Sequence, residues 1–200
     1  MASDAEVKGE VGFFLRAGKL KQIGRRGWTL RGIETPETVA DHSYMTALLA
    51  LYYGEKFKLD VGKVVGLALL HDINEVETGE LVGDKFKPVK EKEKIANGSE
   101  AVGKVVSGLD AKFRKEYAAL WKEENTRGTP EASIARDLNK LELAFQALNY
   151  ELRGHPGERF EDMWEHARES VRDKRLKAVL SKLERSRPSA TPKKKKNKKR

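Results

Sequence analysis

Two neighbouring segments, residues 39–57 and 61–72, are apolar around almost their whole helical circumference. A helix of this kind has no polar face to turn toward water, so other elements must enclose it. The remaining segments repeat apolar residues at steps of three and four, and none alternates with a period of two over a strand's length. We therefore predict an all-α protein, a compact helical bundle with one core around these two segments.

Three helix starts and one long final helix can be predicted from local signals. Residues 35–37 and 129–131 both read Thr-Pro-Glu, which combines a capping hydroxyl, a proline that needs no N–H partner, and a first-turn acid. Asp60 is predicted to cap the second apolar segment. Near the C-terminus, the apolar spacing over residues 160–183 predicts a single last helix.

The positive charge of the chain is concentrated at its C-terminal end. Lys+Arg 40 against Asp+Glu 31 give a net charge of +9, yet the eight residues 193–200 contribute seven positive charges, leaving +2 for the rest. We expect one domain over residues 1–186 and a disordered Lys-rich tail over 187–200 that attracts polyanions weakly. The nearly neutral body gives no reason to expect a nucleic-acid-binding face.

Several protein classes are excluded by composition. The chain has no cysteine, which excludes a disulfide scaffold, thiolate catalysis and cysteine-ligated metals. No apolar run approaches the ~18 residues of a membrane span, and the first ten residues carry acids without the apolar core of a secretory leader. We expect no membrane association and a cytoplasmic location, with nuclear import through the basic tail as an alternative.

Polar residues interrupt the predicted helices at three places where apolar ones are expected. His42 lies in the first apolar segment, His71 and Asp72 end the second, and Asp137 lies beside a later apolar stripe. Charged groups are rarely buried unless they are paired or bind a metal. Each residue alone could be a satisfied core histidine or a salt-bridged aspartate. Together they offer two nitrogens and two oxygens to one divalent cation.

The chain has only four histidines, and two of them occupy its two most apolar segments, which favours the metal hypothesis. His155 and His166 fall in a polar loop and a charged helix, and we expect them to be incidental.

The order His, His-Asp and distant Asp resembles the HD superfamily of metal-dependent phosphohydrolases. The surrounding residues extend the likeness, over roughly residues 10–180, to the HD-domain 5′-deoxynucleotidase family. The stretches that carry it are RRGW at 25–28 followed by Arg31, ETVADHS at 37–43, HDINEVETGEL at 71–81, TPEA at 129–132 and DLNKLE at 137–142.

The resemblance implies a helical bundle, usually dimeric, that removes phosphate from deoxyribonucleoside 5′-monophosphates with a divalent metal. It implies four metal ligands, which are His42, His71, Asp72 and Asp137. Glu75 matches the catalytic carboxylate of the His-Asp-x-x-Glu arrangement. Glu80 stands where the family has Asp, so a second catalytic carboxylate at this position has an arm one methylene longer.

The same resemblance assigns the substrate contacts to residues 25–28. Trp28 matches the residue that packs near the sugar and helps to exclude a 2′-hydroxyl. Its partner arginine is Arg25 or Arg26, of which we favour Arg26. An arginine suits this role because a guanidinium can bind two phosphate oxygens at once. Glu75 follows His71 by one helical turn, so it can face the metal-bound water or the leaving 5′-oxygen, which an acid placed there could protonate.

We therefore expect a metal-dependent 5′-nucleotidase whose partners are a nucleoside monophosphate and a second copy of the chain. Imidazole and carboxylate ligands suit Mn²⁺, Co²⁺, Fe²⁺ or Zn²⁺, with Mg²⁺ a weaker candidate because it prefers oxygen. Two alternatives remain open. One is another HD-type phosphohydrolase, acting on phosphodiesters, nucleoside triphosphates or guanosine tetraphosphate; the other is a non-catalytic nucleotide-binding scaffold.

Overall fold

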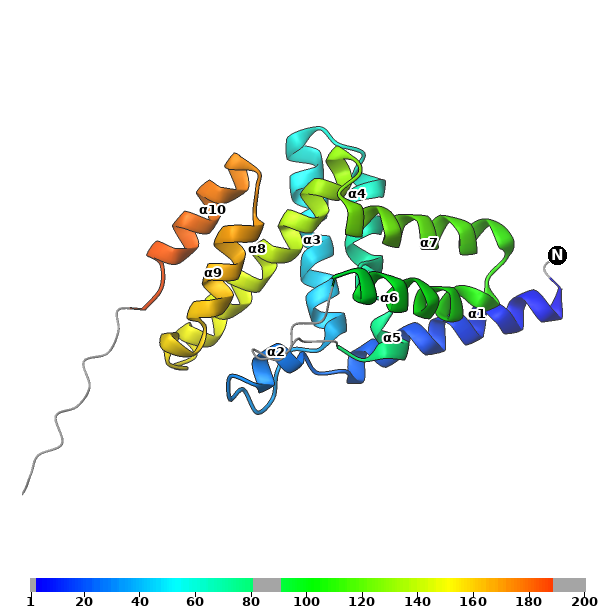
Figure 1. Cartoon of the computed structure of the whole chain (residues 1–200), viewed down its shortest axis with the longest axis horizontal. Coiled ribbons are helices and arrows are strands. Elements are labelled where there is room, and N and C mark those ends of the chain that lie inside the picture. Colours follow the sequence, from blue (N-terminus) through cyan, green and yellow to red (C-terminus); the bar gives the residue numbers. More distant parts are fainter. Residues whose placement is uncertain (1–2, 81–90, 189–200) are drawn as a thin grey trace, which may run out of the picture.

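The computed structural model describes residues 3–80 and 91–188, and in this part of the chain the regular structure is helical (Figure 1). The one β feature described there is an isolated antiparallel bridge between Gly24 and Thr38. The all-α prediction is confirmed. The α-helices are α1 (Asp4–Ala17), α2 (Arg26–Thr29), α3 (Val39–Phe57), α4 (Val61–Leu70), α5 (Glu75–Thr78), α6 (Glu91–Val105), α7 (Ala111–Thr126), α8 (Pro130–Leu152), α9 (Glu161–Ser170) and α10 (Lys174–Arg185).

Helices α3, α4 and α8 pack against one another in the middle of the fold. In Figure 1, α9 and α10 lie on one side of this group, and α1, α6 and α7 lie on the other. No helix in the described part of the chain is both long and apolar enough to cross a bilayer.

The buried apolar side chains form two clusters where the sequence predicted a single core. The larger cluster joins α3, α4, α8, α9 and α10, and includes Leu67, Ala68 and Leu138. The smaller one lies among α1, α6 and α7 and includes Val39 and Ile73. Residues 68–73 pass from one cluster to the other, so polar side chains between them lie at the boundary of the two clusters.

Helix α3 starts three residues later than the Thr-Pro-Glu signal at 35–37 predicts. Thr38 is the cap: its hydroxyl accepts the Asp41 N–H at 3.1 Å, and the Asp41 carboxylate accepts the Thr38 N–H at 2.8 Å. Residues 37–39 pair with residues 23–25, where the Arg25 N–H donates to the Glu37 carbonyl at 2.9 Å, and Thr38 is held in an extended conformation. This pairing delays the helix and fixes residues 25–28 beside it.

The other two predicted starts are confirmed. Asp60 caps α4 by accepting the Lys63 N–H at 3.0 Å, and Thr129 caps α8 by accepting the Ala132 N–H at 3.2 Å.

The predicted single last helix is wrong, because the chain breaks into α9 and α10. The backbone N–H groups of Arg172 and Asp173 donate to one oxygen of Asp137, at 2.8 and 2.7 Å. The Asp173 carboxylate then caps α10 through the N–H groups of Arg175 and Leu176. A buried carboxylate on α8 therefore satisfies backbone groups that a continuous helix would have used internally.

Arg187, the first residue of the predicted tail, donates from Nε to the buried Glu151 carboxylate at 3.0 Å. Packed structure therefore extends to this residue. The predicted Lys-rich segment from residue 189 onward lies outside the described residues.

Candidate metal centre and adjoining cavity

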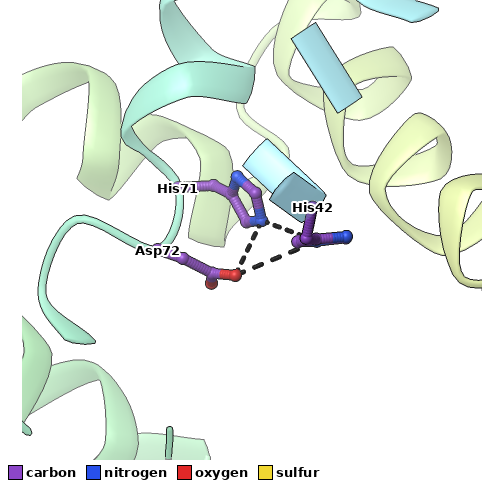
Figure 2. A group of neighbouring side chains, drawn as sticks. All are labelled: His42, His71 and Asp72. Carbon is purple, nitrogen blue, oxygen red and sulfur yellow. Dashed lines mark hydrogen bonds and ion pairs between the residues drawn. The ribbon is translucent and has the colours of Figure 1, made fainter. Parts of the chain in front are cut away.

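Two buried imidazoles meet where α3 passes the end of α4. His42 is 0% exposed and His71 is 5% exposed, and their Nε2 atoms lie 3.1 Å apart. Oδ2 of Asp72 lies 3.0 Å from His71 Nε2 and 3.9 Å from His42 Nε2. Figure 2 shows the three side chains converging on one point. Because α4 ends at Leu70, consecutive residues His71 and Asp72 can turn toward the same position.

The other ring nitrogen of each histidine is already engaged. His71 Nδ1 lies 2.7 Å from the Ala68 carbonyl, which can only accept, so this nitrogen carries a proton. His42 Nδ1 is hydrogen-bonded to a Glu142 carboxylate oxygen, which favours the same tautomer. Two Nε2 lone pairs then face each other and the Asp72 oxygen. Such an arrangement requires a positive charge among them, either a proton or a metal ion.

The pKa shifts describe how the site balances charge without a cation. Burial lowers the pKa of His42, and the charges of Arg25 and His71 lower it further. Burial also acts to lower the pKa of His71, but Asp72 outweighs it, so this pKa is raised. The pKa of Asp72 is lowered because His71, His42 and Arg25 outweigh its burial. Asp72 therefore favours positive charge at this point, and a divalent cation would compete with a proton for it.

The donor set fits a divalent transition metal. Two neutral imidazole nitrogens and one carboxylate oxygen are ligands that suit Zn²⁺, Mn²⁺, Fe²⁺ or Co²⁺ better than Mg²⁺. Three protein ligands also leave coordination positions open, as catalytic sites require.

Asp137 does not join this cluster, which corrects the prediction that it is the fourth ligand. Among the described residues, the potential metal ligands close to His42 Nε2 are His71 and Asp72, and Asp137 is not part of this group. Oδ1 of Asp137 accepts from Arg127 at 2.6 Å, and Oδ2 accepts the two N–H groups at the α9–α10 break. Its burial is explained by these partners, and it serves to hold the fold together.

A cavity of about 580 Å³ adjoins the metal cluster, within the usual size range of small-molecule sites. His71 and Asp72 contribute to its wall, and so do aromatic, cationic and acidic side chains from seven other segments. Its lining residues are Arg25, Gly27, Trp28, Arg31, His71, Asp72, Asn74, Glu75, Glu80, Trp121, Glu124, Asn125, Arg136, Asn139, Lys140, Leu143, Asp162, Met163 and His166.

Arg25, rather than the favoured Arg26, is the arginine of the pair that lines this cavity. Arg26 is exposed at the surface of α2. Arg25 lies with Nη1 3.7 Å from Asp72 and Nε 3.0 Å from Glu80. The pairing of residues 23–25 with 37–39 turns Arg25 inward, so consecutive arginines point to different surroundings. Glu80 also accepts the Gly27 N–H at 3.3 Å, so it holds both ends of this short segment.

Trp28 lines the cavity and is also a fully buried core residue. Its ring packs edge-on against Tyr150 and Phe160, and its indole N–H donates to Glu37 at 2.7 Å. These contacts fix Trp28 as a rigid part of the cavity wall.

Glu75 is the first residue of α5, is almost completely buried, and lines the cavity close in sequence to His71 and Asp72. Its role as the catalytic carboxylate stays a prediction. Helix α5 is short because Gly79 follows with φ +63°, a conformation that favours glycine.

The sequence interpretation missed several residues of the site. His166 was expected to be incidental, yet it lines the cavity. Glu142 is buried and contacts His42. It is an acid beside an apolar stripe, which is the signal that selected Asp137, so the same signal could have identified Glu142. The cavity is also lined by Arg31, which the resemblance had included, and by Arg136, Asn139 and Lys140, to which the sequence interpretation assigned no role.

A helical bundle with paired imidazoles and an adjacent His-Asp carboxylate beside a polar cavity defines the class of HD-domain proteins. Residues 17–182 match the family described as HD domain, and the chain belongs to it.

Characterised relatives extend over most of the chain. The 5′-deoxynucleotidase HDDC2 of Mus musculus is 31% identical over 185 residues, covering 92% of this chain and 91% of that protein. The 5′-deoxynucleotidase HDDC2 of Danio rerio is 35% identical over 146 residues, 72% of each. Among solved structures, a conserved hypothetical protein from Pyrococcus furiosus has a TM-score of 0.72 at 30% identity, over 88% of this chain and 99% of that one.

Proposed function

We propose that the chain is a metal-dependent 5′-deoxynucleotidase, a phosphoric monoester hydrolase that converts deoxyribonucleoside 5′-monophosphates to nucleoside and phosphate. The observation that carries this proposal is the convergence of His42, His71 and Asp72 on one point at the wall of a nucleotide-sized cavity. Relatives named 5′-deoxynucleotidase, similar over most of the chain, support the same reaction.

In this function His42, His71 and Asp72 hold one divalent cation. When bound, the cation supplies Lewis-acid chemistry, since it lowers the pKa of water and offsets the charge of the phosphate. Arg25 reaches the same part of the cavity and carries a permanent charge, so it binds the phosphate oxygens that are not transferred. Glu80 holds the Arg25 guanidinium in place through the 3.0 Å ion pair.

The reaction forms a bond between a water oxygen and phosphorus and breaks the bond from phosphorus to the 5′-oxygen. The leaving oxygen must take up a proton, which Glu75 in its protonated form supplies from the cavity wall, and the proton released by the attacking water restores the acid. Trp28 stands in a fixed orientation against Tyr150 and Phe160, so it forms a rigid surface for the sugar. A rigid surface can discriminate against an added 2′-hydroxyl because it cannot move aside.

The proposal is tested by phosphate release from the purified full chain with deoxy- and ribonucleoside monophosphates. Triphosphates, guanosine tetraphosphate and phosphodiesters serve as comparison substrates. We expect phosphate from the deoxynucleoside monophosphates, its loss with a chelator, and its return when Co²⁺, Mn²⁺ or Zn²⁺ is added. Turnover confined to diesters or triphosphates would indicate the alternative phosphohydrolases, and nucleotide binding without any turnover would indicate a scaffold.

We also propose that the functional assembly is a homodimer that pairs through α3. Although α3 is central, one of its faces carries five large apolar side chains that are 37% to 64% exposed, namely Tyr44, Met45, Leu48, Leu51 and Tyr52. Their spacing is symmetric about Leu48. Two antiparallel copies related by a two-fold axis at Leu48 would therefore place Tyr44 against Tyr52 of the partner subunit, as an isologous interface requires.

Leu48→Glu is expected to convert the dimer to a monomer, because it introduces two like charges at the two-fold axis. Sedimentation velocity of the full chain measures the change. Leu152→Glu is the matched control, since Leu152 is an equally large apolar residue, 65% exposed at the end of α8. A monomeric wild type, or a Leu48→Glu variant that stays dimeric, would contradict this interface.

A further inference from the structure

Two acids, one buried and one partly buried, adjoin the metal cluster on the side away from the cation position. Glu142, on α8, is 1% exposed and contacts His42 Nδ1. Glu37, just before α3, has a carboxylate oxygen within 4.8 Å of the contacting atoms of both His42 and Glu142. Burying the Glu142 carboxylate in contact with His42 is costly, so its position calls for a role.

The contacts of Glu142 suit a role in orienting a metal ligand. An imidazole has two nitrogens, and only one that lacks a proton can bind a cation. An acceptor at Nδ1 keeps the proton on that nitrogen and leaves Nε2 free, which is the atom that faces His71 and Asp72. For His71 the Ala68 carbonyl does this, and for His42 the acceptor is Glu142.

Glu37 extends the same chain of contacts to the cavity wall. Its carboxylate accepts the Trp28 indole N–H at 2.7 Å, and its backbone N–H donates to the Tyr150 hydroxyl at 2.9 Å. Glu37 therefore bonds Trp28 and lies within 4.8 Å of the Glu142 carboxylate, which in turn contacts His42. Glu37 and Glu142 therefore support two parts of the site. Glu37 supports Trp28, in the wall that would meet the sugar, and Glu142 supports His42, which would hold the cation.

We propose that Glu142 is a positioning residue that presents Nε2 of His42 to the metal, with Glu37 linking it to Trp28. This inference rests on the proposed metal site. Carboxylates that orient metal-binding histidines typically change metal affinity by about 10–100-fold when they are removed.

Co²⁺ titration of the metal-stripped full chain tests the proposal, by calorimetry and by the visible absorption of the bound ion. Glu142→Gln keeps an acceptor but loses the charge, and we expect about 10-fold weaker Co²⁺ binding. Glu142→Ala removes the acceptor, and we expect a loss near 100-fold together with an altered spectrum. In ¹⁵N spectra of the metal-free protein, His42 should change from the Nδ1–H tautomer to a mixture in the Ala variant.

Glu151→Gln is the matched control, because Glu151 is also a buried acid on α8 that accepts from an aromatic ring N–H, that of Trp164 at 2.8 Å, but it does not contact His42. A merely structural role for Glu142 predicts that both Gln variants lower thermal stability and that neither changes Co²⁺ affinity, which would overturn the inference. Unchanged binding by Glu142→Gln and Glu142→Ala would overturn it as well. A wild-type chain that binds no Co²⁺ would instead refute the metal site itself, and with it the proposed function.

Discussion

Glu75→Gln is expected to lower kcat by about 10²–10⁴-fold while the chain still binds its divalent metal with wild-type stoichiometry. Glutamine fills the same space but cannot supply a proton to the leaving 5′-oxygen. Because Glu75 lines the cavity and is not one of the three converging ligands, metal binding should survive the change. Steady-state kinetics on a deoxynucleoside monophosphate and metal analysis of the same preparation measure the two effects.

Glu77→Gln provides the control for this variant. Glu77 lies on the same short helix, α5, but is exposed and is not one of the residues that line the cavity. Its kcat should stay close to that of the wild type. If Glu75→Gln retains full turnover, or if both variants lose turnover equally, Glu75 is not the proton donor.

Asp137→Asn is expected to lower the free energy of unfolding by about 3 kcal/mol without removing the metal. The substitution keeps the shape of the side chain but replaces a buried charge that accepts from Arg127 and from the N–H groups of Arg172 and Asp173. The expected loss of unfolding free energy lies at the lower end of the range that is typical for breaking a buried ion pair, because Arg127 is partly exposed to solvent. Denaturant unfolding of the metal-free chain measures the loss.

Asp173→Asn is the control for that loss, since asparagine caps a helix about as well as aspartate and α10 should keep its start. Its unfolding free energy should remain close to that of the wild type. An Asp137→Asn variant with unchanged stability and no bound metal would restore Asp137 as a ligand and contradict the present assignment.

Asp137 and Glu142 show why the sequence could predict part of the site and not the rest. Both are acids beside the apolar stripe of one helix, and the pattern establishes only that each is buried and needs a partner. These partners include distant parts of the chain, Arg172 and Asp173 for Asp137 and His42 for Glu142. His71 and Asp72 were easier to predict because their convergence depends on one local event, the end of α4 at Leu70.

The arginine pair and the start of α3 were mispredicted for a common reason. The backbone pairing of residues 23–25 with 37–39 overrides the local helix-start signal at Thr35 and turns Arg25 inward. No propensity or periodicity encodes such a pairing between two short irregular segments. The helices themselves were predicted well, because their apolar faces repeat over many residues and each contributes to burial.

The central claim is that His42, His71 and Asp72 bind one cation at the wall of the cavity. A crystal structure of the full chain grown with Zn²⁺, with anomalous data collected at the zinc edge, tests it directly. The account predicts one strong peak about 2.0–2.2 Å from Nε2 of both histidines and from a carboxylate oxygen of Asp72. A map without a peak between these atoms, or with the ion bound at Asp137 instead, would contradict it.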